Sequence, residues 1–216
     1  MQAELETHTL VRIADARSLE GAGVLPSWAW ATLRRAPWAV VRRVGPRDGL
    51  IPVGIRGARR SERLAAWLRP EAVLECLTPP ELATRRAWRL LPRRARLPAL
   101  AALEKVEVIM RDRRCAHRWG PCGSVAFELA SGVATVTAQS DLDLMLRADR
   151  PLESAVAAEL ATALSRLAVR VDVLLEFPHG AVALAEYVAA SAPLLLRTPE
   201  GPRLVQDPWP QPLAAP

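Results

Sequence analysis

Cysteine, histidine and long apolar segments are scarce in this chain of 216 residues. Three cysteines are an odd number, which argues against a disulfide framework and for a reducing compartment. Half of the chain is hydrophobic, yet no apolar run approaches the roughly 20 residues that a membrane-spanning helix needs. The residues after Met1 lack the basic and apolar regions of a signal peptide. These absences predict a cytoplasmic protein without membrane contact.

Cysteine and histidine also give little sign of a metal centre. Cys115, His117 and Cys122 lie close in the sequence, but their spacing matches no common zinc site and no fourth ligand is evident. The three histidines are scattered along the chain, and none is predicted to be catalytic.

Positive charge comes almost entirely from arginine and is concentrated in the first half. Residues 1–98 carry 18 arginines against 9 acidic residues, whereas residues 99–216 carry 11 basic and 14 acidic residues, and the net charge is +6. Arginine binds phosphate and carboxylate groups through two parallel hydrogen bonds. The first half is therefore expected to bind an acidic protein, a polyphosphate, or both, although many of its arginines are expected to be solvated surface.

An acidic pair, Asp141 and Asp143, lies on a short apolar segment. Charged and apolar residues alternate at its start, which is the period of a β-strand. Residues i and i+2 of a strand project from one face with Cα atoms roughly 6.5–7 Å apart, a separation that suits two oxygen ligands of divalent cations. Leu142 and Leu144 would face the core. The alternative interpretation is an exposed edge strand with two acids of no chemical role.

A third carboxylate lies in a second predicted strand, residues 170–176. Between the strands, residues 151–168 have apolar side chains at helical spacing, and Pro151 suits the first turn of a helix. A strand–helix–strand unit would bring Asp172 to the acidic pair, so that three carboxylates meet at one site.

Two alternatives to this role of Asp172 stay open. Glu176, at the end of the same strand, is the second candidate for the third acid. Arg170 is close enough in sequence to hold Asp172 in a salt bridge of structural value alone.

Gly123 and Ser124 precede the acidic pair and open a predicted helix over residues 123–132. Ser124 is predicted to be its N-cap, and Gly132 is predicted to end it in the left-handed conformation. The backbone N–H groups of such a turn and the positive end of the helix bind phosphate oxygens. A Gly-Ser turn upstream of two aspartates on an apolar strand is typical of nucleotidyltransferases.

The first half is predicted to form a domain of its own. Two strands joined by a Gly- and Pro-rich turn, and then two helices, are expected at residues 38–44, 50–56, 59–68 and 80–91. The first of these helices would display Arg59, Arg60 and Arg63 on neighbouring turns, as a docking face for an acidic partner.

A basic stretch bracketed by Pro92 and Pro98 predicts a linker or an exposed loop. We expect a basic N-terminal α/β domain over residues 1–95 and a nucleotidyltransferase-like catalytic domain over residues 96–216. The predicted fold class is α+β, a mixed α/β arrangement in which the second domain has a small mixed sheet flanked by helices. The Pro-rich tail is expected to wrap the surface, with Trp209 tucked against it.

A family resemblance is carried by Trp119-Gly-Pro-Cys-Gly-Ser124, Phe127-Glu-Leu-Ala-Ser-Gly132, Ser140-Asp-Leu-Asp-Leu144, Asp172-Val-Leu-Leu-Glu176 and Ile51-Pro-Val-Gly-Ile-Arg-Gly57. These segments are similar to those of the phosphoribosyl-dephospho-CoA transferases, the holo-acyl-carrier-protein synthases of malonate decarboxylase. The Gly-Ser and Asp-x-Asp core is shared by the wider polymerase-β-like nucleotidyltransferase superfamily. The spacing from Ser124 to Asp141 is longer than is usual in that superfamily.

The resemblance implies a specific reaction. Such enzymes transfer the 2'-(5''-phosphoribosyl)-3'-dephospho-CoA group from triphosphoribosyl-dephospho-CoA to a serine of the acyl-carrier-protein subunit, and pyrophosphate leaves. It implies that Asp141 and Asp143 are catalytic and hold Mg²⁺ or Mn²⁺, and that Asp172 is catalytic and orients or deprotonates the serine. The substrate-binding residues implied are Gly123, Ser124 and Ser140.

Two other functions fit parts of the sequence. The nearer one is a nucleotidyltransferase of the same fold that acts on another protein or on a small molecule. The more distant one is a nucleic-acid-binding protein that uses the arginine-rich half. Nucleic acid is not the expected partner, because the arginines are not interleaved with aromatic residues and the acidic strands would repel phosphates without metal.

Overall fold

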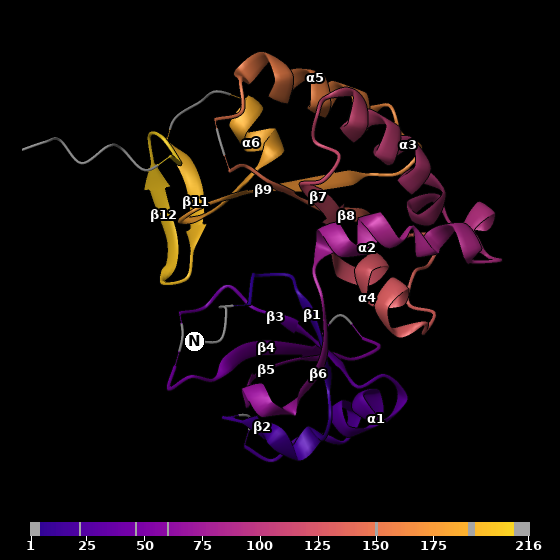
Figure 1. The fold of residues 1–216 in the computed structure, drawn as a ribbon, viewed down its shortest axis with the longest axis vertical. Helices are drawn as coiled ribbons and strands as arrows, with labels where there is room; N and C mark the ends of the chain where they lie inside the picture. The colour runs from indigo at the N-terminus through magenta and orange to yellow at the C-terminus, as the bar shows by residue number, and fades with distance from the viewer. Residues whose placement is uncertain are drawn as a thin grey trace, which may run out of the picture.

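The computed structural model describes residues 5–21, 23–45, 47–59, 61–149, 151–189 and 193–209. Two six-stranded sheets follow one another along the chain, each accompanied by helices (Figure 1). This arrangement confirms the predicted α+β class. Within the described ranges, no helix is both long enough and apolar enough to cross a membrane.

The first sheet has the strand order β2-β5-β4-β3-β1-β6, and its paired strands are antiparallel. One face buries Val11, Val53 and Leu68 against Leu33 of helix α1. The strands predicted at residues 38–44 and 50–56 are confirmed as β3 and β4. The elements of this half are β1 (Leu10–Ile13), the 3₁₀ helix η1 (Ala16–Ser18), β2 (Leu19–Glu20), α1 (Ser27–Arg35), β3 (Trp38–Val41), β4 (Ile51–Arg56), β5 (Arg63–Leu68), η2 (Pro70–Ala72) and β6 (Val73–Leu77).

The helix predicted over residues 59–68 is wrong. Its second half is strand β5, which pairs with β4 along its whole length. Helix propensity is a weak preference, and pairing with a neighbouring strand overrides it. Arg63 therefore lies on a strand and Arg59 in the preceding turn, whereas Arg60 lies outside the described residues. Arg59 and Arg63 therefore do not share the helical docking face that the sequence predicted.

The second sheet has the order β12-β11-β10-β9-β8-β7, with β8 and β9 parallel and the other pairs antiparallel. Helices α3, α5 and α6 cover one face (Figure 1) and form a core with Leu142, Leu144 and Leu175. The elements are α2 (Pro79–Arg85), the 3₁₀ helices η3 (Ala87–Leu90) and η4 (Arg94–Arg96), α3 (Pro98–Asp112), β7 (Trp119–Pro121), α4 (Gly123–Ser131), β8 (Leu142–Arg147), α5 (Ser154–Ser165), β9 (Val171–Phe177), β10 (Gly180–Ala183), α6 (Leu184–Val188), β11 (Leu194–Thr198) and β12 (Gly201–Val205).

The predicted strand–helix–strand unit is confirmed as β8, α5 and β9. Parallel neighbours need a crossover connection, and α5 supplies it. The helix begins at Ser154, so Pro151 precedes it and does not lie in its first turn. The tail also differs from the prediction, because residues 201–205 pair with β11 as strand β12. Trp209 does pack inward, edge-on to Phe177 with ring centroids 5.1 Å apart.

The change from the first sheet to the second falls between Leu77 and Pro79, earlier than the boundary predicted at residues 95/96. Helix α2 contacts β7, and Ala83 and Trp88 belong to the core of the second half. The basic stretch after Pro92 is therefore a connection inside the second half. The helix predicted over residues 80–91 is present but breaks after α2, where Arg86 adopts the left-handed conformation.

The two halves share an apolar contact. Leu10, Trp38 and Leu77 of the first sheet form one buried cluster with Leu82 of α2 and Ala126 of α4. The first sheet thus turns one face to α1 and the other to the second half (Figure 1). Because the cluster draws on both halves, it orients the first sheet toward the uncovered face of the second.

A charged contact joins the halves as well. Glu176 of β9 accepts a hydrogen bond of 2.5 Å from Arg43 and lies 3.4 Å from His8 Nε2. Burial alone would raise the pKa of Glu176, but the neighbouring His8 and the hydrogen bond and charge of Arg43 outweigh burial and lower it. Glu176 is therefore ionised at neutral pH and ties the second sheet to the first.

Removing this tie should destabilise the protein. Arg43→Met leaves the mostly buried Glu176 carboxylate without its main partner, and we expect a loss of about 3 kcal/mol in the free energy of unfolding at pH 7. Arg69→Met is the matched control, because Arg69 pairs with Glu20 on the exposed surface, where solvent screens the pair, and it should cost much less than Arg43→Met. Urea unfolding of both variants measures the difference.

The same pair should make stability depend on pH. The pKa of Glu176 in the folded protein lies below its ordinary value of 4.5, so the stabilisation is complete above that value and is lost as the pH falls through the lowered pKa. The difference between wild type and Arg43→Met should therefore shrink at acidic pH. A difference that is constant from neutral to strongly acidic pH would contradict this assignment.

Candidate active site

Asp143 of β8 and Asp172 of β9 lie directly opposite each other in the parallel pair, and Asp141 immediately precedes β8. Leu142 and Leu144 are 0% and 1% exposed, so the alternation of a strand directs Asp143 to the other face of the sheet. That face looks toward the first sheet (Figure 1). The structure thus brings the three predicted carboxylates together where β8 and β9 begin.

The crowding of negative charge is visible in the pKa of Asp143. Partial burial raises this pKa, and the charges of Asp172 and Asp141 raise it further. Arg56 and His8 act in the opposite direction but do not cancel the rise. Burial and the two neighbouring carboxylates together disfavour the ionised form of Asp143, and a bound cation would favour it again.

Asp172 has the salt bridge that was the structural alternative. Arg170 donates from Nε and Nη2 to Asp172 Oδ1 at 3.2 Å, and both side chains are largely exposed. Glu176 lies four residues further along β9, opposite Arg147, and is engaged with Arg43 and His8. Of the two candidates for the third acid, Asp172 is therefore the one beside Asp143.

Gly123 begins helix α4 directly against the acidic pair. Its φ is +58°, and a Cβ atom at this position would clash with Asp143 Oδ2. The preceding residue, Cys122, donates its N–H to the carbonyl of Asp143 at 2.8 Å. This bond anchors the start of the helix to β8. Cys122 is the N-cap residue, because its backbone is extended and its carbonyl accepts the first helical hydrogen bond from the N–H of Ala126.

Ser124 consequently lies inside the first turn of α4, and its predicted N-cap role is wrong. The predicted helix itself is confirmed over Gly123–Ser131, and Gly132 ends it with φ +70°. The backbone N–H groups of the first turn of a helix have no intrahelical partners. The positive end of α4 therefore lies beside the carboxylates, where it suits the oxygens of a phosphate group.

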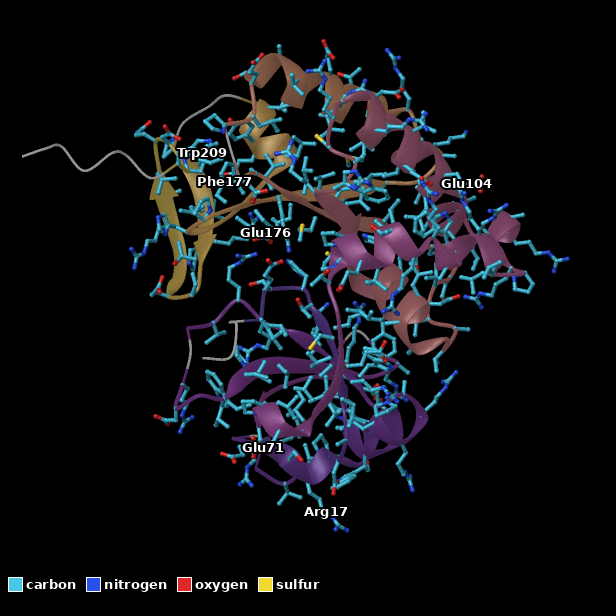
Figure 2. All side chains as sticks on the ribbon, viewed as in Figure 1. Arg17, Glu71, Glu104, Glu176, Phe177 and Trp209 are labelled. Carbon is cyan, nitrogen blue, oxygen red and sulfur yellow. The ribbon has the colours of Figure 1, made fainter. Side chains whose placement is uncertain are left out.

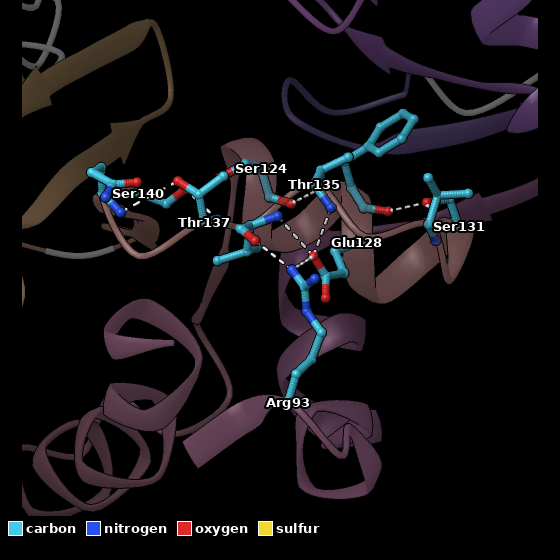
Figure 3. Close-up of polar contacts among 11 residues, drawn as sticks. Arg93, Ser124, Glu128, Ser131, Thr135, Thr137 and Ser140 are labelled. Atoms are coloured by element: carbon cyan, nitrogen blue, oxygen red, sulfur yellow. Dashed lines mark hydrogen bonds and ion pairs between the residues drawn. The ribbon is translucent and has the colours of Figure 1, made fainter. Parts of the chain in front are cut away.

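A buried glutamate of α4 holds the long connection between Ser124 and Asp141 in place. Glu128 is 2% exposed, and its Oε2 accepts hydrogen bonds of 2.8 Å from the N–H groups of Thr135 and Val136 and one of 3.2 Å from Arg93 (Figure 3). The connection from α4 to β8 is thus held against the helix. The sequence reading gave Glu128 no role, and its only signal was an acid in an apolar helical segment.

Ser124 and Ser140 both contribute to the order of this connection (Figure 3). The carbonyl of Ser124 accepts a 2.9 Å hydrogen bond from Thr135 Oγ1, and Ser140 Oγ accepts one of 3.0 Å from the N–H of Thr137. Ser140 ends the connection next to Asp141. Both serines therefore border the carboxylates, and the hydroxyl of Ser140 is engaged within its own turn.

The first sheet contributes positive charge that sequence reasoning did not place. Arg56 ends β4 and His8 precedes β1, and both act on the pKa of Asp143. The sequence does not indicate this effect, because Arg56 and His8 are far from Asp143 along the chain. Only the packing of the two halves brings them near it. The candidate site is therefore built by both halves of the chain.

Metal ligation was predicted for Asp141 and Asp143. Among the described residues, no group of three or more His, Cys, Asp or Glu side chains is arranged to hold a metal ion. The chemistry of the available donors nevertheless fits a hard divalent cation, because carboxylate oxygens are the ligands that Mg²⁺ and Mn²⁺ prefer. The raised pKa of Asp143 is consistent with that fit.

Carboxylates on adjacent parallel strands beside a helix N-terminus are typical of enzymes that transfer phosphate-linked groups. The comparisons with known proteins place the chain more closely. Residues 82–208 match the profile of the phosphoribosyl-dephospho-CoA transferase MdcG C-terminal domain, and residues 6–79 match that of the corresponding N-terminal domain. The chain belongs to the phosphoribosyl-dephospho-CoA transferase family.

Curated relatives that carry the name phosphoribosyl-dephospho-CoA transferase align over nearly their whole length. The protein from Pseudomonas putida is 41% identical over 186 residues, which are 85% of this chain and 86% of the relative. The one from Azotobacter vinelandii is 42% identical over 188 residues, 85% of each chain. The one from Klebsiella pneumoniae is 33% identical over 209 residues, 97% of this chain and 98% of the relative. No solved structure matches the chain.

The close approach at Gly123 predicts an unequal response to alanine. Gly132→Ala, at φ +70° with open space around the new Cβ, should lose about 1 kcal/mol of unfolding free energy through backbone strain. Gly123→Ala, at a similar φ, carries the additional clash with Asp143 and should lose at least about 2 kcal/mol. Chemical denaturation of the two variants measures both values, and equal losses would show that the carboxylate moves aside freely.

Proposed function

We propose that this protein transfers the 2'-(5''-phosphoribosyl)-3'-dephospho-CoA group from triphosphoribosyl-dephospho-CoA to a serine of the apo acyl-carrier-protein subunit of malonate decarboxylase. The observation that carries the proposal is the register of β8 and β9, which sets Asp143 against Asp172 with the start of α4 beside them. Membership of the phosphoribosyl-dephospho-CoA transferase family supports the choice of donor.

The reaction exchanges one phosphorus–oxygen bond for another. The serine Oγ attacks the phosphorus next to the ribose, and the bond from that phosphorus to the pyrophosphate group breaks. A phosphodiester remains on the carrier, pyrophosphate leaves, and the serine proton passes to a carboxylate or to water. Asp172 faces Asp143 across the strand pair, so we assign it the orientation or deprotonation of the serine.

Other groups of the chain would hold the donor. The N–H groups of the first turn of α4, at Gly123 and Ser124, lie beside the carboxylates and suit the phosphate oxygens. Arg56 approaches the same place from the first sheet and would neutralise part of the charge of the polyphosphate. Asp141 and Asp143 would hold Mg²⁺ or Mn²⁺, which when bound neutralises phosphate oxygens and stabilises the leaving pyrophosphate.

The carrier protein is proposed as the acceptor on the basis of charge and family. Residues 1–98 carry twice as many arginines as acidic residues, 18 against 9, and a basic surface of this kind attracts an acidic protein. A different acceptor protein would need the same phosphorus chemistry but not the same partner. Genes for malonate decarboxylase subunits beside the gene for this chain would favour the carrier.

Mass spectrometry of the apo carrier tests the function directly. Incubation with the enzyme, triphosphoribosyl-dephospho-CoA and Mg²⁺ should increase the carrier mass by that of the phosphoribosyl-dephospho-CoA group and release pyrophosphate in equal amount. Replacing the acceptor serine by alanine should abolish the gain. Labelling of the carrier from ATP, without labelling from the CoA-derived donor, would instead identify a nucleotidyltransferase of different specificity.

Asp141→Asn and Asp143→Asn should abolish transfer without unfolding the protein. For Asp143, the raised pKa means that ionisation is disfavoured in the folded state, so the neutral side chain should be equally stable or slightly more stable at pH 7 in metal-free buffer. Thermal melts with and without Mg²⁺, alongside the transfer assay, check both statements. Turnover equal to that of the wild type in either variant would refute the assignment.

Asp172→Asn should separate chemistry from binding. If Asp172 orients or deprotonates the acceptor serine, its loss should lower turnover by about 10²–10⁴-fold while the affinity for the donor persists. Calorimetry of donor binding and single-turnover kinetics measure the two quantities. Arg170→Gln is the matched control, since it removes the salt bridge and leaves the carboxylate in place. Loss of donor affinity without a separate defect in turnover would assign Asp172 to donor binding alone.

A further inference from the structure

A cavity of about 1700 Å³ lies between the two halves of the chain. It is larger than the roughly 300–1,000 Å³ of a pocket for a drug-sized ligand. Met145 of β8 and Glu176 of β9 both line it, and they follow Asp143 and Asp172 on the same sheet face by two and four residues. The cavity therefore begins about 7 Å from the carboxylates along the strands.

Both halves contribute apolar wall to this cavity. Ile51 and Pro52 of β4 line it from the first sheet, and Phe177 of β9 and Val205 of β12 line it from the second. In Figure 2, Glu176 lies at the junction of the two halves and Phe177 further along the same sheet. The cavity continues away from the carboxylates between walls that carry both apolar and polar groups, which suits an extended, uncharged arm with amide and hydroxyl groups.

The same cavity is lined by four arginines. Arg43 forms an ion pair with Glu176, and Arg147 forms one with Glu6. Arg203 approaches Glu200 at 3.9 Å on the exposed surface. Arg42 lines the cavity with no ion pair to any acid among the described residues, and its aliphatic part lies across Gly54.

We infer that this cavity binds the dephospho-CoA portion of the donor, with the diphosphate bridge on Arg42 and the pantetheine arm between the apolar walls. The inference rests on the proposed function for the identity of the donor. The groups that line the cavity suit a molecule with an anionic centre and an uncharged arm, and the nearby carboxylates suit its reactive polyphosphate end. Such a molecule could place that end at the carboxylates while its remainder fills the cavity.

A carrier-protein segment fits the cavity less well. A carrier that is drawn to the basic half needs a broad docking surface, whereas this cavity is a space between walls that belong to the two halves. An acidic segment would also have to bury its charges beside Glu176, which is itself ionised and mostly buried. The donor brings its negative charge in compact phosphate groups that arginine binds in pairs of hydrogen bonds.

Binding of a stable fragment tests the inference without turnover. The probe is S-methyl 3'-dephospho-CoA, which lacks the triphosphoribosyl group and a free thiol. We expect calorimetry to show binding that is tighter than that of ADP, because ADP lacks the pantetheine arm. Arg42→Ala should weaken the binding by about tenfold or more, since it removes a charged hydrogen-bonding group from the diphosphate.

Two controls make the measurement specific. Arg17→Ala removes an exposed arginine at the far end of the first half (Figure 2) and should leave the affinity unchanged. Asp143→Asn should also bind the fragment as tightly as the wild type, because the fragment lacks the reacting phosphates. Circular dichroism of each variant shows that the fold is retained.

The alkylation rate of Cys76 can show whether the fragment binds in this cavity. This cysteine lines the cavity and is partly exposed, whereas Cys115 and Cys122 are 1% and 7% exposed. Burial, followed by the charges of Glu81 and Glu75, raises the pKa of Cys76, so alkylation is run near pH 9. The bound fragment should slow alkylation of Cys76 several-fold, as measured by peptide mass spectrometry.

The outcomes separate this inference from the proposed function. Binding that depends on Arg42 and protects Cys76 supports the cavity as the dephospho-CoA site, even if the carrier proves not to be the acceptor. Transfer to the carrier without any binding of the fragment would overturn the inference and leave the proposed function intact. The same holds if the fragment binds but Arg42→Ala does not weaken the binding and Cys76 is not protected.

Discussion

The parallel register of β8 and β9 is the constraint on which the candidate site depends. It sets Asp143 opposite Asp172 and, through the alternation of the strand, directs Leu142 and Leu144 into the core formed with α3 and α5. The same pairing that buries the leucines therefore brings like charges together. A slip of one residue in β8 would exchange the two faces and bury the carboxylate. The apolar face thus enforces an arrangement that the charges alone would oppose.

The protein relieves this repulsion only in part. Arg170 contacts Asp172, and Arg56 and His8 act on Asp143 from the first sheet, yet the pKa of Asp143 is still raised. A site that remains short of positive charge favours a cationic ligand over further packing. The proposed metal ions follow from this imbalance, since they would bring the positive charge that the fold does not supply. Bound cations would in turn attract the phosphate oxygens of the donor.

The first half of the chain is part of the site rather than an appendage. Arg43 and His8 hold Glu176, and the apolar cluster around Trp38 packs on α2 and α4. These contacts bring Arg56 to the carboxylates and close one wall of the cavity. The two family profiles divide the chain at nearly the point where the first sheet ends. Each profile therefore corresponds to one sheet, and the cavity lies where the two meet.

Local patterns in the sequence were enough to predict several elements of the site. The alternation of charged and apolar residues predicted β8, and the helical spacing of apolar residues predicted α5. The i, i+2 spacing of Asp141 and Asp143 predicted that both carboxylates share one face. These signals depend only on backbone periodicity. The family was recognisable from the same short segments. The helix expected at residues 59–68 was an error, because residues 63–68 pair with β4 as strand β5.

Tertiary structure alone decided the rest. The bond that holds Cys122 at the start of α4 reaches the carbonyl of Asp143, and the need for glycine at position 123 depends partly on the side chain of that same aspartate. Glu128 acquired its role from a connection that folds back onto its helix. Arg56 and Arg43 reached the second sheet only because the two halves pack together. These relations join residues that are distant in the chain, and pairing, burial and charge act between them only once folding has brought them into contact.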